Sequence, residues 1–122
     1  MGKFLGKAAI EMASDRKAIA VDVPEWGGTV NLVSPTAADS ERYQFKNRAA
    51  LEKAAGGPGD GIVMAELVCL CLCDESGNRL FGDSEVAGFA HARGALVVER
   101  LWRQCLDLVG LSEKSRKDAE GN

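Results

Sequence analysis

The feature that most constrains this chain is one apolar run from Ile62 to Cys73, interrupted only by Glu66. The run is too short to cross a membrane, which takes about 20 residues, so the rest of the chain must bury it. Periodicity does not separate a buried helix from a buried strand here. Its length favours a helix, and its Val and Cys content favours a strand. We interpret it as a central buried helix.

Size and charge narrow the class of protein. A chain of 122 residues with 46% hydrophobic residues is typical of a single globular domain. Fifteen Lys and Arg against eighteen Asp and Glu give a net charge of −3, so the basic patch of a nucleic-acid binder is not expected. The first residues lack the continuous apolar stretch of a signal peptide, which predicts a cytoplasmic protein without a membrane segment.

The cysteines predict packing rather than chemistry. Cys69, Cys71 and Cys73 alternate within the apolar run, and Cys105 lies in a second apolar segment. Zinc sites favour C-x-x-C pairs with further Cys or His ligands, and the only histidine is His91. We therefore expect reduced, buried thiols and no metal site.

The N-terminal third predicts a short helix followed by a hairpin. Residues 3–17 hold apolar side chains at helical spacing with charges between them. Residues 18–33 form two β-prone runs around Pro24 and the pair Gly27-Gly28, a pattern typical of a β-hairpin.

Two caps compete for the start of the next helix. Ser34 followed by Pro35 is a good N-terminal cap, and Thr36 with Asp39 offers an alternative one turn later. We expect this helix to run along the surface to about Ala55. Residues 56–61 are rich in Gly and Pro and predict a flexible connection.

The C-terminal half predicts two further helices. Residues 74–78 form a turn, Asp83 or Ser84 caps a helix, and Gly94 marks a bend. The last helix has one apolar face and ends near Gly110. The predicted fold is mainly α, a small helical domain of about four to five helices with an N-terminal β-hairpin, in residues 1–111. Residues 112–122 are expected to form a flexible tail. The residues on the apolar face of the last helix are Val98, Leu101, Trp102, Cys105, Leu108 and Val109.

The segment from Asp74 to Glu85 resembles a calcium-binding loop. It has oxygen-bearing side chains at loop positions 1, 3, 5 and 12, but Arg79 stands where such a loop needs glycine for its sharp turn. An Asx turn leading into a helix cap explains the same residues, and we prefer it.

The motifs of the common enzyme classes are missing. The sequence has no nucleophile elbow, P-loop or dinucleotide-binding glycine motif. His91 offers one formal partner for a cysteine nucleophile, although an exposed histidine is the commoner case. We predict that the chain is not an enzyme and that it uses no cofactor.

Binding is the remaining class of function. Trp26 lies in the hairpin turn, and Leu101 with Trp102 lies on the last helix. Exposed tryptophan is enriched at interaction hot spots, although tryptophan is more often partly buried in its own domain. We predict a contact or self-association surface formed by Trp26, Leu101 and Trp102.

Four stretches carry a family resemblance. They are Pro-Glu-Trp-Gly-Gly within residues 21–28, Val30-Asn31-Leu32-Val33-Ser34 leading into a helix with Glu41-Arg42, Asp-Glu-Ser-Gly-Asn-Arg-Leu-Phe in residues 74–81, and Leu-Trp to Gly-Leu-Ser in residues 101–112. Together they resemble the tail assembly chaperones of long, noncontractile-tailed bacteriophages, the lambda G-like family. The resemblance covers most of residues 19–112.

The resemblance implies a mainly helical fold, no catalysis and a role in viral morphogenesis. It implies a homo-oligomer that binds the tape measure protein and keeps this long helical chain soluble. It also implies a longer product of programmed frameshifting that recruits tail tube protein, with the polar residues after Ser112 as its tether. Such a protein acts in the host cytoplasm and is not expected in the mature virion.

Two other classes of function stay open at this stage. One is a small structural head–tail or tail protein that remains in the virion. The other is a small cytosolic regulatory module built on the loop from Asp74 to Glu85.

Overall fold

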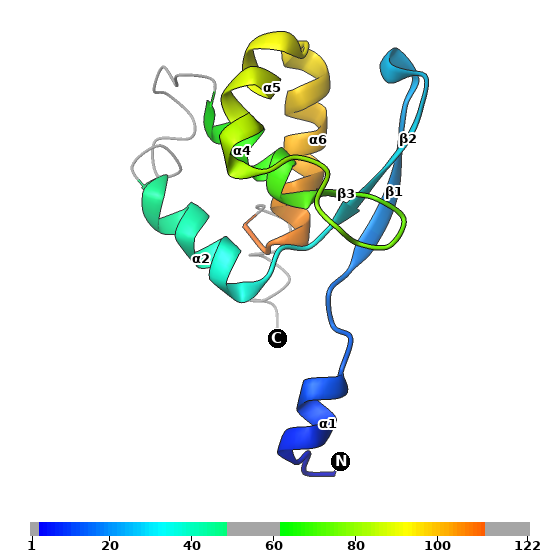
Figure 1. The fold of residues 1–122 in the computed structure, drawn as a ribbon, viewed down its shortest axis with the longest axis vertical. Helices are drawn as coiled ribbons and strands as arrows, with labels where there is room; N and C mark the ends of the chain where they lie inside the picture. The colour runs from blue at the N-terminus through cyan, green and yellow to red at the C-terminus, as the bar shows by residue number, and fades with distance from the viewer. Residues whose placement is uncertain (1–2, 49–61, 112–122) are drawn as a thin grey trace.

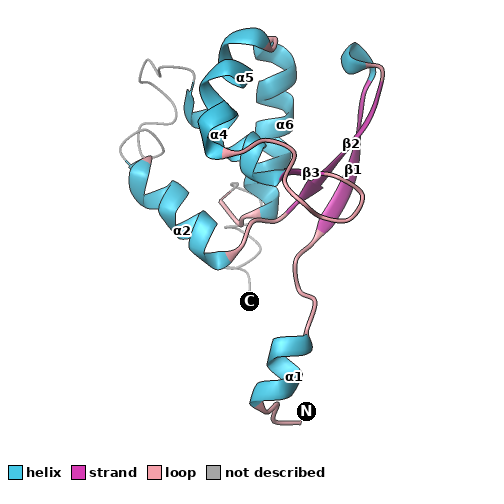
Figure 2. Ribbon diagram, in the orientation of Figure 1, coloured by secondary structure: helices cyan, strands magenta, loops and turns pink. Residues whose placement is uncertain are grey.

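The computed structural model describes residues 3–48 and 62–111. Within them, five α-helices accompany a three-stranded antiparallel sheet of order β1-β2-β3 (Figures 1 and 2). This confirms the mainly α fold with an N-terminal hairpin. Short 3-10 turns cover Pro24–Trp26 and Asp83–Glu85. The elements are α1 Lys7–Met12, β1 Ala18–Val23, β2 Gly28–Val33, α2 Ala37–Lys46, α4 Ile62–Cys71, β3 Leu72–Cys73, α5 Val86–Ala92 and α6 Ala95–Leu108.

Helix α4 is the centre of the core, as the apolar run predicts. Its residues from Leu67 to Cys71 are all buried, and it packs against α5, α6 and β2. The expected helix ends two residues early, however, because Leu72 and Cys73 form β3. Leu72 pairs with Leu32 of β2, and its carbonyl oxygen accepts a hydrogen bond from the Leu80 amide at 3.0 Å. Sheet pairing thus satisfies the buried backbone where the helix stops.

The hairpin forms as predicted. β1 and β2 pair from Ala18 with Val33 to Val23 with Gly28, and Val23 and Leu32 are fully buried. The reversal uses the 3-10 turn and then Gly27, whose φ of 80° lies in the left-handed region that favours glycine.

Helix α2 differs from the prediction at both ends. Thr36 caps it, because its hydroxyl oxygen accepts a hydrogen bond from the Asp39 amide at 3.2 Å. The Ser34 cap is wrong, since the Ser34 hydroxyl accepts from the Lys17 amide instead and extends the hairpin. The helix ends at Lys46 rather than near Ala55.

Asn47 accounts for the early end of α2. Its backbone amide and its side-chain amide both donate to the Tyr43 carbonyl oxygen at 3.0 Å, and Asn47 itself is buried. Asparagine competes well with helix continuation in this way. The remainder of the predicted helix, together with the connection at 56–61, lies outside the described residues.

The two C-terminal helices lie close to their predicted positions. The amide of Gly82 donates to the Glu85 carboxylate at 2.9 Å ahead of α5, so the expected side-chain cap from Asp83 or Ser84 is wrong. Gly94 precedes α6 as the expected bend. At the end of α6, Gly110 has a φ of 76° and the Leu111 amide donates to the Leu106 carbonyl, which is a glycine-dependent helix stop.

Helix α1 stands apart from the rest of the fold. It has no buried residue, and Figure 1 shows it separated from the other elements by an extended segment. It confirms a helix within residues 3–17, but a shorter one. The expected division at residue 111 stays a prediction, because the tail at 112–122 lies outside the described residues. Among the described helices, none is long and apolar enough to cross a membrane.

Two leucines of α6 provide a test of this core. Leu101 is fully buried and Leu96 is 80% exposed. Replacing Leu101 with Ala leaves a cavity and should lower the free energy of unfolding by about 2–5 kcal/mol. Leu96→Ala, the matched control, should change it by less than about 0.5 kcal/mol. Urea denaturation measures both, and equal effects would contradict this packing.

Candidate protein-binding groove

An apolar groove of about 560 Å³ lies between the hairpin and α5. Trp26 and Val30 contribute from the hairpin, and the segment after β3 contributes Leu80 and Phe81. Helix α5 contributes Phe89 and Gly88, with Ala92 and Arg93 at its end. This hairpin–α5 groove has the size and apolar lining typical of a binding site.

Three aromatic rings build the floor of the hairpin–α5 groove. The rings of Trp26 and Phe89 meet nearly edge to face, at 86° with centroids 6.2 Å apart. Phe81 contacts the same Phe89 ring at 5.1 Å. Phe89 is almost fully buried, while Trp26 and Phe81 are half-buried. The cluster is therefore anchored in the core through Phe89 and remains accessible to a partner at Trp26 and Phe81. Edge-to-face packing keeps such rings in place before any partner arrives.

An ion pair fixes the hairpin turn to the helical body. Both guanidinium nitrogens of Arg100 on α6 donate to the two carboxylate oxygens of Glu25, at 2.8 and 2.9 Å. This bidentate pair lowers the pKa of Glu25 from 4.5 to about 2. Trp26 follows Glu25 in the sequence, so this ion pair holds the hairpin wall of the groove at a set distance from the helical part of the fold.

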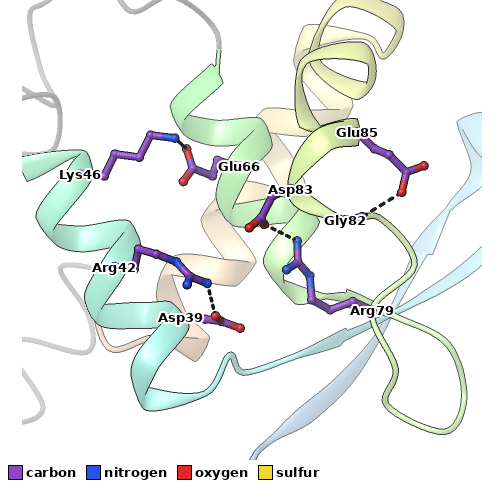
Figure 3. A network of polar contacts seen from close by, with 8 residues as sticks. All are labelled: Asp39, Arg42, Lys46, Glu66, Arg79, Gly82, Asp83 and Glu85. Atoms are coloured by element: carbon purple, nitrogen blue, oxygen red, sulfur yellow. Dashed lines mark hydrogen bonds and ion pairs between the residues drawn. The ribbon is translucent and has the colours of Figure 1, made fainter.

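The loop after β3 forms an Asx turn. The Asp74 carboxylate accepts from the amides of Ser76 and Asn78, at 2.9 and 3.0 Å, and these bonds lower the pKa of Asp74. Arg79 pairs with Asp83 at 3.2 Å (Figure 3). The described residues contain no group of three or more His, Cys, Asp or Glu side chains placed to hold a metal ion.

A second hollow, of about 250 Å³, lies between α2, α4 and the start of α5. It is more polar, and Figure 3 shows ion pairs beside it. Lys46 pairs with Glu66 at 3.2 Å and joins α2 to α4, while Arg42 pairs with Asp39 within α2. These charges satisfy one another, so this hollow is a weaker candidate for a partner than the hairpin–α5 groove.

The cysteines are four free, buried thiols, as the sequence predicts. Burial raises the pKa of Cys69 to about 11, and it also raises that of Cys73. A hydrogen bond with Cys71, together with burial, raises the pKa of Cys105. Such thiols stay protonated at neutral pH, and His91 is exposed on α5. Cys69, Cys73 and Cys105 therefore lack the lowered pKa of an activated nucleophile.

The predicted binding residues fall in three different settings. Trp26 lines the hairpin–α5 groove. Leu101 is fully buried, so its side chain belongs to the core and not to a contact surface. Trp102 is half-buried on the α2 side, where its indole N–H is buried near the Tyr43 hydroxyl without an ordinary hydrogen bond. The structure does not bring these three residues together, and a partner contact by Trp26 or Trp102 stays a prediction.

The sequence did not single out Phe81 and Phe89 as groove residues. Their rings meet only because the turn after β3 brings Phe81 back over α5. The one signal available was that Phe81 closes the specific Asp-Glu-x-Gly-Asn-x-Leu-Phe element.

Acid should release the hairpin turn through Glu25. A carboxyl group whose pKa is lowered by folding adds stability above its unfolded value of 4.5, and this is lost as the pH falls towards about 2. Wild type should therefore be more stable than Glu25→Gln above pH 4.5, with the difference shrinking between pH 4.5 and 2. Urea unfolding across that pH range measures it.

Glu99→Gln serves as the control for this experiment, since it removes an ion pair with Arg103 that lies within α6 alone. A Glu25→Gln difference that does not change with pH would show that the pair is not formed in solution.

This fold is similar to that of a solved phage protein, although no protein-family model matches the sequence. No curated protein matches it either. Among solved structures, the tail assembly chaperone of bacteriophage HK97 aligns with a TM-score of 0.57 and 26% sequence identity, over 87% of this chain and 95% of that one.

This match confirms the family resemblance read from the sequence: the chain has the fold of a phage tail assembly chaperone. The similarity supports a general role in phage tail assembly. The HK97 protein is named for an assembly role, which agrees with the prediction that this chain is not an enzyme.

Proposed function

We propose that this protein is a tail assembly chaperone that binds the tape measure protein of its phage and keeps it soluble until the tail tube forms around it. The observation that carries the proposal is the structural match to the HK97 chaperone over 87% of the chain. In this proposal the protein acts in the host cytoplasm and is absent from the finished virion.

The hairpin–α5 groove suits the chemistry of such a client. A long helical chain exposes apolar stripes before the tube covers them, and exposed stripes of this kind aggregate. A groove with a fixed aromatic floor accepts an amphipathic helix through anchors at i, i+3, i+4 and i+7. We assign this role to Trp26, Phe81 and Phe89, whose rings already contact one another.

Several copies acting together would bind the client more tightly than one copy. One groove of about 560 Å³ covers only a short part of a helix. A homo-oligomer that repeats the groove along the client gains avidity from each added copy. A frameshift-extended form would add a module that recruits tail tube protein, joined through the polar residues after Ser112.

Co-expression with the tape measure protein of the same phage tests this function. We expect soluble tape measure protein that co-purifies with the wild-type chain, against aggregated tape measure protein alone. Trp26→Ala removes the hairpin's aromatic anchor and should reduce the amount that co-purifies by about tenfold, the effect of losing a hot-spot residue. Phe45→Ala is the matched control, because Phe45 is 79% exposed and lies outside the groove.

A second variant separates binding from folding. Trp26→Ala also removes a packing contact with Phe89, whereas Gly88→Gln fills the groove from a position with no atom within 4 Å of its added Cβ. Thermal unfolding should show Gly88→Gln at least as stable as wild type, since glycine is unfavourable inside a helix. Undiminished co-purification with this variant would remove the groove from the proposal. Detection of the protein in purified virions would favour a structural role instead.

A further inference from the structure

Helix α2 turns a polar face towards the domain that it covers. The hollow of about 250 Å³ beneath it is lined from this side by four α2 residues at helical spacing, Asp39, Arg42, Tyr43 and Lys46. Three of the four are charged, and Tyr43 is the one buried residue of the helix. A surface helix is ordinarily held by a continuous apolar stripe. Helix α2 lacks such a stripe, so its attachment depends on individual contacts.

Tyr43 makes the principal contact between α2 and the core. Its side chain is 1% exposed and lies close to Cys71 of α4 and to Trp102 and Cys105 of α6. Its hydroxyl donates to the Val63 carbonyl oxygen at 3.1 Å. Burial raises the pKa of Tyr43 to about 12, as expected for a phenol held away from water. A single aromatic side chain thus fills the space between α4 and α6 on this side.

An ion pair makes a second contact between α2 and α4. The Lys46 ammonium lies 3.2 Å from the Glu66 carboxylate (Figure 3). The Lys46 side chain is 64% exposed, so solvent screens this pair and it adds little stability. Arg42 pairs with Asp39 inside α2, and that pair does not attach the helix to α4.

Detaching α2 costs far less than unfolding the domain. A helix of ten residues is marginal in water on its own, so α2 loses its order once Tyr43 leaves the core. The detachment uncovers one buried side chain and breaks the bond to Val63 and the pair with Glu66. Helix α4, in contrast, buries six residues and packs against α5, α6 and β2. Segments held so lightly open while the rest of a protein stays folded.

We propose that α2 is a latch, which opens as a unit from a folded domain and thereby controls access to Trp102. In the closed state the Trp102 indole N–H is buried near the Tyr43 hydroxyl without an ordinary hydrogen bond. Opening lets water bond to this N–H, which offsets part of the cost of uncovering the Tyr43 ring. The latch also covers the thiol of Cys105. It is a property of this chain alone, so it does not rest on the proposed function.

Native-state hydrogen exchange of wild type and two variants tests the latch. The α2 amides should be at least about tenfold less protected than those of α4. Tyr43→Phe keeps the ring and removes the bond to Val63, so α2 protection should fall about two- to tenfold. Val68 is fully buried and lies two residues after Glu66, on the far side of α4. Val68→Ala should therefore lower α4 protection about tenfold and leave α2 protection unchanged.

The Val68→Ala result separates the latch from global unfolding. If α2 opened only when the whole domain unfolds, its protection would equal that of α4 in wild type and would fall with it in Val68→Ala. Either outcome would overturn the proposal. Unchanged α2 protection in Tyr43→Phe would overturn it as well, because Tyr43 would then not hold the helix.

Alkylation of the native protein with iodoacetamide, followed by peptide mapping, shows what the latch covers. Lys46→Gln removes the ion pair to α4 and should raise the labelling rate of Cys105 about two- to fivefold. Arg42→Gln is the matched control, because its ion pair lies within α2, and it should leave this rate unchanged. A Cys105 rate that does not respond to Lys46→Gln, or that responds equally to Arg42→Gln, would contradict a latch held at Lys46 over this thiol.

Discussion

The burial of helix α4 is the interaction on which the rest of this structure depends. Its sequence has almost no polar side to turn towards water, so α2, α5, α6 and β2 pack around it. Helices α5 and α6 pack on it, β2 closes another side, and Tyr43 on α2 donates a hydrogen bond to the Val63 carbonyl at its first turn. The single charge in this helix, Glu66, stays at the edge and pairs with Lys46. Removing apolar surface of this extent from water is what makes so small a domain stable.

The groove is a consequence of how the hairpin is attached to that core. Its base is tied to α4 through β3, and its turn is tied to α6 through Glu25 and Arg100. Between these two points the strands stand away from α5, and the aromatic cluster lines the gap instead of filling it. A fixed, half-open apolar surface follows, and such a preorganised surface suits the binding role proposed for the groove.

The residues that carry the fold were readable from the sequence wherever the signal was local. The apolar run, the Pro and Gly residues of the hairpin turn, and the glycine stop after α6 each act through neighbouring atoms, and each was predicted in place. Predictions failed where a partner from a distant segment decided the local structure. Thr36 rather than Ser34 caps α2 because Ser34 is used by Lys17, a residue of another segment. Helix α4 gives way to β3 because β2 offers Leu72 and Cys73 partners that the sequence around them does not reveal.

The class of fold, the buried centre and the resemblance to a tail assembly chaperone therefore follow from the residues alone, because these rest on hydrophobic patterning and short motifs. The binding site follows only from the packing of distant segments. That packing placed Leu101 in the core, moved Trp102 to a different side from Trp26, and joined Trp26 to Phe81 and Phe89. It also left the N-terminal arm uncovered. Which apolar side chains stay open to a partner is set by contacts between distant segments, and no local pattern in the chain encodes that choice.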